Sequence, residues 1–429
     1  MPPEVRWLLL RAFGPPDAPF AEEVEPAAAL AAARRFEVSP RVAARLGRSR
    51  LAAELGSEAA AGFQRDLLAT VAQGLRLEAL LMDVAAVAAE RSIPLVLLKY
   101  AALEASGVLA PGARAACDLD LMAPPERAGE LQEALVARGF RASGLPDSEH
   151  QLPALIHPAG GLLEVHRLVL GVRPDGAGSA TVATLERAGM LTPVVDLPGC
   201  FLPAREVQMA HVLVHGIGQH GFWPDSYPLL RTLSDLADLG FHDEAAAPLA
   251  RRAARLVARD VSAEESEAAR ELCAALVAGE DLTPHPPLPS HSHSPGEGAP
   301  PPERHDLESD GGSPSPGWGE RDGRGGQGVR SPGARLLLLH ILAGRLAPDY
   351  ASALRLSLFR AQPSDRRPAV RLVHSVLDAV FLSRAQIDAI YGRPRHPLGY
   401  LGRRLARPFD LLLRLGTYGA RTFRLRERS

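Results

Sequence analysis

Two aspartates are the residues whose type and spacing most directly indicate chemistry. Asp118 and Asp120 stand two residues apart in the apolar run CDLDLMA. In a β-strand, side chains two residues apart leave the same face, roughly 6 to 7 Å apart along the backbone. Two divalent ions about 3.5 to 4 Å apart need carboxylates from a rigid element, and Mg²⁺ prefers carboxylate and phosphate oxygens. The pair is therefore able to hold a metal, although two exposed aspartates at a strand end also occur often by chance.

Glu164 is the third candidate metal ligand. It lies in LLEVHRLVL, an apolar run that follows the turn signal Gly160-Gly161. An unpaired carboxylate is costly to bury, and metal binding is one reason for its presence. His166 follows on the same face of this expected strand, where it either contacts a ligand or the metal, or orients Glu164 through a hydrogen bond. The orienting role is the preferred interpretation.

A second group of polar residues lies further along the chain. His211 and His215 are four residues apart on an expected helix, with His220 shortly after. This spacing can hold a transition metal, but no HExxH motif accompanies it, so histidines packed in the core are the preferred interpretation. A metalloprotein built on His166, His211 and His215 is a remote alternative. Asp235 in the next helix either reaches the same cleft or, more simply, is a surface carboxylate.

The elements that position these residues follow from the pattern of apolar residues. An α/β core is expected over residues 91–202. Within it, the run 93–103 predicts a buried strand that passes into a helix, and the runs 117–123 and 162–170 predict two further strands. Residues 124–138 begin with prolines and end before a glycine, which predicts a helix.

Helical regions are expected on both sides of this core. Residues 1–90 form a helical N-terminal region, because apolar residues recur there at helical spacing. The recurring residues include Leu67, Leu68, Val71, Leu75, Ala79 and Met82. Residues 203–282 form a second helical region, in which Gly240 ends a helix.

The remaining sequence changes character twice. Residues 283–333 are rich in Pro, Gly and Ser and nearly free of apolar residues, which predicts a disordered linker. Residues 334–429 resume helical periodicity and end in a basic tail with eight arginines after residue 402. A solvated helix face is the preferred interpretation of the tail, and contact with an acidic partner, RNA or a membrane surface is the alternative.

The composition is that of an ordinary soluble protein. The 429 residues are enough for two or three compact units, and the formal charge of −2 gives no overall attraction to nucleic acid. Three widely separated cysteines favour a reducing cytoplasm over a disulfide framework or a cysteine zinc site. The apolar run near the N-terminus is too short for a signal peptide, and no run reaches the about 18 apolar residues of a membrane span.

Three motifs in order carry a resemblance to a known family. VLLKYAAL, RAACDLDLM and LLEVH resemble the bacterial uncharacterised nucleotidyltransferase family of the polymerase-beta-like superfamily, whose motifs read roughly LLKGxAL, RxxxDxDLLV and vElH. The resemblance covers residues from about 90 to 240. It implies an α/β (α+β) polymerase-beta-like core flanked by helices. It also implies transfer of a nucleotide from an NTP to an unidentified acceptor hydroxyl on a small molecule, a protein or RNA.

The same resemblance implies roles for particular residues. Two Mg²⁺ ions are expected on Asp118, Asp120 and Glu164, with Glu164 aligning or deprotonating the attacking hydroxyl. The candidate nucleotide contacts are Lys99, Arg114 and His166. Lys99 could instead be a solvated lysine at a strand end, and Arg114 could pair with Asp118 structurally.

One residue departs from the family pattern. Tyr100 stands where the family has a glycine after the lysine, so a bulky side chain enters a loop that is expected to approach the triphosphate closely. The alternative function is therefore a binding scaffold of the same fold with impaired catalysis, in which Tyr100 blocks the triphosphate.

Overall fold

The structure is a computed structural model that describes residues 2–143, 148–219 and 229–280, together with residues 402 and 406. The expected linker over 283–333 and almost all of the expected C-terminal helical region lie outside the described residues, as does His220. None of the described helices is long and apolar enough to cross a membrane.

A seven-stranded mixed sheet forms the centre of the α/β part, with the strand order β3-β4-β5-β2-β1-β7-β6. Its strands are β1 (Leu95–Leu97), β2 (Asp118–Met122), β3 (Arg141–Ala142), β4 (Leu155–Ile156), β5 (Leu162–His166), β6 (Leu191–Pro193) and β7 (Cys200–Pro203). β2 runs parallel to β5, and β1 runs parallel to β7, whereas the other neighbours are antiparallel. The two longest strands, β2 and β5, are thus neighbours inside the sheet, and the two shortest, β3 and β4, lie at one end of it.

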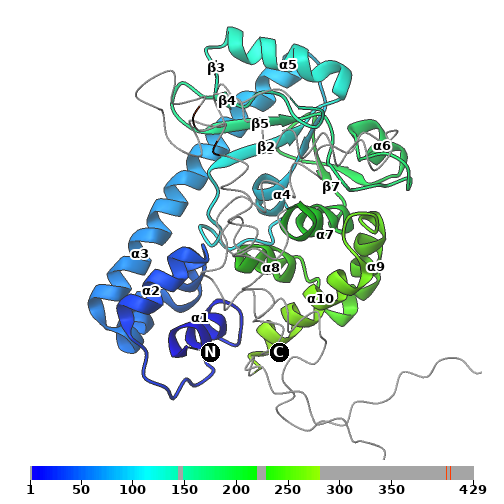
Figure 1. Ribbon diagram of the computed structural model, residues 1–429. Helices are drawn as coiled ribbons and strands as arrows, with labels where there is room; N and C mark the ends of the chain where they lie inside the picture. Colours follow the sequence, from blue (N-terminus) through cyan, green and yellow to red (C-terminus); the bar gives the residue numbers. More distant parts are fainter. Residues whose placement is uncertain (1, 144–147, 220–228, 281–401, 403–405, 407–429) are drawn as a thin grey trace, which may run out of the picture.

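Helices surround this sheet and continue well beyond it (Figure 1). The α-helices are α1 (Pro3–Ala12), α2 (Pro26–Arg35), α3 (Ser39–Glu90), α4 (Lys99–Ala105), α5 (Pro125–Ala137), α6 (Val182–Arg187), α7 (Arg205–Leu213), α8 (Leu229–Asp238), α9 (Ala247–Leu256) and α10 (Ala263–Ala278). A π-helical segment η1 (Val214–Gln219) continues α7, and a 3₁₀ turn η2 (Glu244–Ala246) precedes α9. The expected α/β core flanked by helices is confirmed.

Long segments with clear periodicity form the elements that the sequence predicts. The run 93–103 divides into β1 and α4, and the run 117–123 contains β2. Helix α5 ends before Gly139, which has a φ of 96°. Gly240 likewise follows α8 with a φ of 72°. Glycine is suited to these helix ends because it has no Cβ to clash in the left-handed region.

Two features differ from the expectation. Strands β3, β4, β6 and β7 are not predicted, because two to four residues are too few to display a period. The expected helix that carries His211 and His215 is α-helical only as far as Leu213 and then widens into η1. Such π-helical segments are rare and often lie at functional sites.

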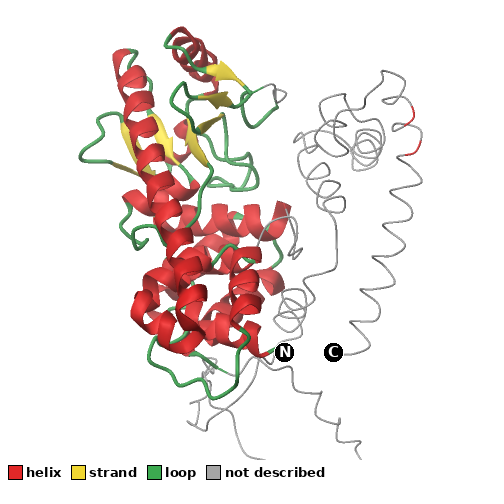
Figure 2. Ribbon diagram, turned by 90° about the vertical axis from the view of Figure 1, so that its left-hand side faces the viewer, coloured by secondary structure: helices red, strands yellow, loops and turns green. Residues whose placement is uncertain are grey.

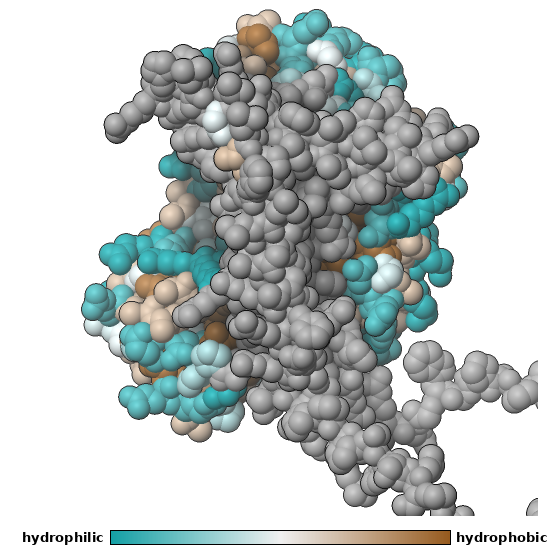
Figure 3. Space-filling view, in the orientation of Figure 1, coloured by the Kyte–Doolittle hydropathy of each residue, from teal (hydrophilic) through white to brown (hydrophobic). Residues whose placement is uncertain are grey.

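Two hydrophobic cores support the sheet. One packs α3 and α5 against the strands and includes Leu80, Leu121 and Val165. The other joins the N-terminal helices to α7–α10 and includes Trp7 and Leu233. Figure 2 shows the sheet above this group of helices, with α3 running from one to the other. The described surface visible in Figure 3 is mostly hydrophilic, with smaller hydrophobic areas between.

Candidate active site

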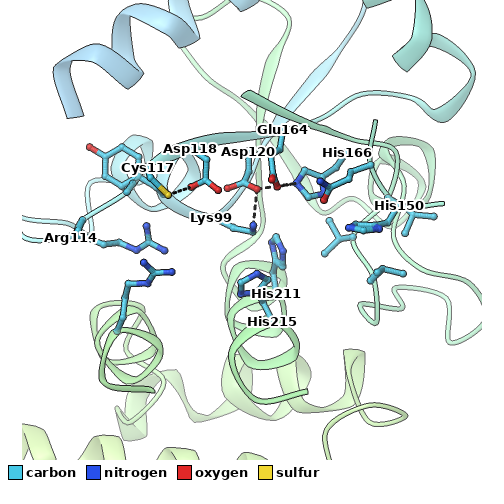
Figure 4. A pocket seen from close by; sticks show the side chains of 18 residues that line it. Lys99, Arg114, Cys117, Asp118, Asp120, His150, Glu164, His166, His211 and His215 are labelled. Atoms are coloured by element: carbon cyan, nitrogen blue, oxygen red, sulfur yellow. Dashed lines mark hydrogen bonds and ion pairs between the residues drawn. The ribbon is translucent and has the colours of Figure 1, made fainter. Parts of the chain in front are cut away.

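The carboxylates are brought together by the parallel pairing of β2 with β5. Asp120 lies directly opposite Glu164 in this pairing, and Met122 lies opposite His166. Because side chains alternate along a strand, Asp118, Asp120, Glu164 and His166 all leave the same face of the sheet. Figure 4 shows the three carboxylates in a row on this face.

Asp120 is the most deeply buried carboxylate of the row, with 2% of its surface exposed. Its Oδ1 accepts a hydrogen bond from Lys99 Nζ at 2.7 Å and lies 2.9 Å from His166 Nε2. Burial opposes ionisation, but Lys99 and His166 outweigh it and hold the pKa of Asp120 well below its usual range. Asp120 is therefore a carboxylate at neutral pH.

Lys99 follows β1, which pairs with β2, and this places its amine beside Asp120. Burial alone lowers the pKa of Lys99, but Asp120, Glu164 and Asp118 raise it by more, so the amine stays protonated. Its backbone has a φ of 45°, a left-handed conformation that is uncommon for a residue with a Cβ. Lys99 is thus a partly buried cation in an ion pair, and the alternative of a solvated lysine is wrong.

Glu164 lies beside the same imidazole. Its Oε2 is 3.7 Å from His166 Nε2, farther than Asp120 Oδ1 is. Burial and then the negative charge of Asp120 raise the pKa of Glu164. The preferred interpretation had His166 orienting Glu164, whereas the structure brings its ring closer to Asp120.

Ligand atoms of Asp120, Glu164 and His166 all lie within 4.8 Å of one another, the one such set of three among the described residues. Asp118 stands outside this set, partly buried, with Cys117 Sγ 3.5 Å from its Oδ1. Asp120 and Glu164, with Asp118 on the same face of the sheet, provide the oxygen ligands that Mg²⁺ prefers. The His166 imidazole would suit a transition metal. The donor set therefore fits a divalent cation.

Arg114 forms a buried ion pair with a carboxylate of α8. Its Nε donates to both carboxylate oxygens of Asp235, at 2.8 and 3.0 Å. Asp235 is 2% exposed, so the interpretation of a surface carboxylate is wrong. Helix α8 packs its apolar side into the core and carries Asp235 with it, and a carboxylate is stable there because a guanidinium pairs with it.

A cavity of about 220 Å³ opens in front of these residues. The described residues that line it are Lys99, Tyr100, Arg114, Ala115, Ala116, Cys117, Asp118, Asp120, His150, Gln151, Glu164, His166, Leu168, Val169, Leu170, His211, His215 and Arg231. In Figure 4, Arg114 lies on one side of the carboxylates and His150 on the other, while His211 and His215 approach from the helix below. The cavity thus has an arginine side and a histidine side.

Among the basic residues of this lining, sequence reasoning missed His150 and Arg231. His150 Nδ1 is 2.9 Å from Ser148 Oγ, and its ring centroid is 5.9 Å from that of His166. Arg231 of α8 forms an ion pair with Glu37. Neither belongs to a strand-borne motif, so no local signal marks them.

His211 is a buried histidine, as the preferred interpretation expected. Burial, followed by Lys99 and His166, lowers its pKa to about 3, so the ring is neutral at physiological pH. Its ring centroid is 6.2 Å from that of His215. Neither ring joins the set of three converging donors, so the geometry does not assemble the remote histidine metal site.

Tyr100 lies in α4 rather than in a loop. Tyr100 is 7% exposed and belongs to the core that packs α3 and α5 against the strands, and the Arg114 guanidinium lies 5.9 Å from its ring centroid. Its hydroxyl is directed at Gly74 of α3, where a Cβ would lie only 2.7 Å away. The ring therefore packs between two helices at the wall of the cavity.

Strand-borne carboxylates beside a lysine and two arginines define a site suited to a divalent cation and phosphate groups. A protein-family model described as an uncharacterised nucleotidyltransferase matches residues 22–267. The match covers more than half of the chain, which belongs to this family, and the resemblance seen in the motifs is confirmed. The match also includes α3 and, after the sheet, α7 to α9. No curated protein and no solved structure matches the chain.

Proposed function

We propose that this protein is a Mg²⁺-dependent enzyme that transfers a nucleotide from an NTP to an acceptor hydroxyl. The observation that carries the proposal is the register of β2 and β5, which sets Asp120 opposite Glu164 with Asp118 on the same face. Family membership supports the reaction class, and the chemistry of the acceptor is left open.

Asp118, Asp120 and Glu164 are the residues that would hold the cation. Bound Mg²⁺ would supply Lewis-acid neutralisation of the charge on the transferred phosphate and the leaving pyrophosphate. Asp120 is already ionised, and Lys99 and His166 hold its carboxylate in a fixed orientation. Ordering the Asp120 carboxylate for metal binding would therefore cost little free energy.

The cationic side of the cavity is suited to the triphosphate. Lys99, Arg114 and Arg231 line the cavity. Each forms an ion pair with a carboxylate, and this ion pair holds its side chain in place. In the reaction, the acceptor oxygen forms a bond to the α-phosphorus of the NTP. The bond between the α-phosphorus and the oxygen that bridges to the β-phosphorus breaks, and pyrophosphate leaves with that oxygen. Glu164 is the nearby carboxylate that would take the proton of the acceptor hydroxyl.

Calorimetric titration of each of the four NTPs, with and without Mg²⁺, tests this proposal. We expect wild-type protein to bind at least one NTP only with Mg²⁺ present. In Asp118→Asn/Asp120→Asn, we expect affinity to fall by at least roughly tenfold, because carboxylate charges that hold the cation are removed. Asp196→Asn is the matched control, because Asp196 is exposed in the turn between β6 and β7.

The outcomes separate this function from the alternative of a scaffold with impaired catalysis. Binding that needs both Mg²⁺ and the aspartates supports the transferase and names its donor. Absence of binding to every NTP by folded wild-type protein would contradict it and favour a scaffold in which Tyr100 excludes the triphosphate. Equal loss in Asp196→Asn would mean that the aspartate effect is not specific to the site.

A further inference from the structure

The C-terminal half of α3 carries an apolar stripe that the active site does not use. Seven residues are exposed at alternating spacings of four and three: Leu68, Ala72, Leu75, Ala79, Met82, Ala86 and Ala89. This is the spacing of a coiled-coil seam, and we call these residues the α3 seam. The opposite side of the same helix, which includes Leu77, Leu80 and Val84, is buried in the core.

The exposure of the α3 seam is large. Leu68, Leu75 and Met82 are 60%, 62% and 54% exposed, and they are half of the large hydrophobic residues that the described part of the chain exposes. Single exposed apolar residues are common, but a line of them about 30 Å long on one helix indicates an interaction surface. Figure 2 views the molecule from the side on which α3 lies.

We propose that the α3 seam is the contact between two copies of this chain, packed antiparallel about a twofold axis near Leu80 and Leu81. In an antiparallel coiled coil, each core layer pairs an a position of one helix with a d position of the partner helix. Here that sets Leu75 against the partner's Ala86 and Met82 against the partner's Ala79. Leu75 and Met82 then each face a small side chain, so the two helices can approach closely there and interdigitate. Ala72 faces the partner's Ala89, and Leu68 lies beyond the end of the partner's helix at Glu90.

A parallel pairing would fit less well. It would set Ala72, Ala79 and Ala86 each against its own copy, so gaps would alternate with the layers formed by Leu and Met. The size pattern therefore favours the antiparallel direction.

Charges beside the α3 seam select the register. Arg76 and Asp83 flank the seam on one side, and both are exposed. In the proposed register, Arg76 faces the partner's Asp83, and the twofold axis makes this pair twice. Glu78 on the other flank faces the partner's Ala85, so no like charges meet there.

The two adjacent registers are unfavourable for the same reason. A shift of one heptad in one direction sets Arg76 against the partner's Arg76, and a shift in the other direction sets Asp83 against the partner's Asp83. Like charges opposed across a seam are destabilising. Charge and size thus agree on a single arrangement of two copies.

The oligomeric state of the full chain, measured by analytical ultracentrifugation over roughly a hundredfold range of concentration, tests the proposal. We expect wild type to show twice the mass of one chain at the higher concentrations. Leu75→Glu should raise the dissociation constant by at least roughly tenfold, because it buries a carboxylate in two symmetric layers. Val136→Glu on α5 is the matched control, since Val136 is 48% exposed and lies outside the seam.

Charge reversal tests the register itself. Arg76→Glu and Asp83→Arg should each weaken the dimer, and the double variant should restore it, because the pair is reformed with its signs exchanged. Asp83 also lies 3.2 Å from His157, so thermal unfolding of each variant checks that the fold is intact.

Two results would overturn the proposal. The first is a monomer at every concentration, in which case the seam is covered by a segment of residues 281–429 of the same chain or by another protein. The second is a dimer that Leu75→Glu leaves unchanged, because the contact would then lie elsewhere on the molecule.

Discussion

Asp120 connects the charges of the site. It lies between the Lys99 amine and the His166 imidazole, while Glu164 faces it across the strand pair. Asp118 is set apart from the converging donors and is more exposed than Asp120. Asp118 and Asp120 are therefore chemically unequal, although their spacing in the sequence treats them alike.

The buried ion pair of Arg114 with Asp235 gives a prediction at the residue scale. Asp235→Asn removes the buried negative charge to which the Arg114 guanidinium donates, and we expect the free energy of unfolding to fall by about 3–5 kcal/mol. Urea unfolding measures this. Because Asp235 also holds Arg114 at the cavity, the affinity for the NTP should fall in the same variant.

Conservative replacement distinguishes positioning from simple loss of stability. Asp235→Glu keeps the charge, so it should recover part of the free energy of unfolding and part of the affinity for the NTP that Asp235→Asn loses. Asp17→Asn is the control, since Asp17 is 94% exposed in its pair with Arg50 and should change stability by less than about 1 kcal/mol. A drop as large in Asp17→Asn as in Asp235→Asn would contradict the role assigned to burial.

At the scale of elements, the packing of α4 against α3 decides where Tyr100 lies. Helix α4 begins directly after Leu98, which follows strand β1. Tyr100 lies on the buried face of α4, which packs toward α3. The left-handed backbone of Lys99 marks the point where the strand direction changes into the helix. One short connection thus sets both the ion pair with Asp120 and the packing of Tyr100.

The contact between Gly74 and Tyr100 gives a prediction at this scale. Alanine at 74 would place a Cβ 2.7 Å from the Tyr100 hydroxyl, so we expect Gly74→Ala to be destabilising despite the higher helix propensity of alanine. In Tyr100→Phe the hydroxyl is gone. The same Gly74→Ala change should then stabilise α3 by up to about 1 kcal/mol.

A double-mutant cycle in urea measures this coupling. If Gly74→Ala has the same effect with tyrosine and with phenylalanine at 100, the proposed contact between α3 and α4 does not exist. Gly129→Ala in α5 is a suitable comparison, because a Cβ there meets nothing within 4 Å.

At the scale of the whole molecule, helices distant in sequence share one core. Residues from α1–α3 pack with residues from α7–α10, and buried residues from the sheet, such as Met122, belong to the same cluster. Arg41 of α3 extends this contact through a two-point ion pair with Asp238 of α8, at 2.6 and 2.8 Å. The helix that bears Asp235 is therefore held from the N-terminal side as well.

Breaking the ion pair between Arg41 and Asp238 gives a prediction for the whole molecule. Arg41→Met leaves Asp238 without its partner in a largely buried position, and we expect the free energy of unfolding to fall by about 3 kcal/mol. Arg34→Met is the control, because the Arg34 side chain is 50% exposed in its pair with Asp66. Equal and small losses in both variants, measured by urea unfolding, would show that the tie between α3 and α8 contributes little.

The sequence by itself determined the elements that carry the site. Apolar runs around Asp118, Asp120 and Glu164 predict strands because each run is long enough to be buried, and the alternation of side chains sets the face from which the carboxylates leave. Helix ends such as Gly139 and Gly240 are also local, since they depend on the φ angle of one residue.

Only the tertiary structure decided which of these faces meet. Asp120 lies opposite Glu164 because β2 and β5 pair in parallel with one register, and Arg114 pairs with Asp235 across 121 positions of sequence. His150 joins the cavity from a loop without a motif. Periodicity describes what one segment buries, whereas partners and register depend on the packing of the whole chain, which no local pattern contains.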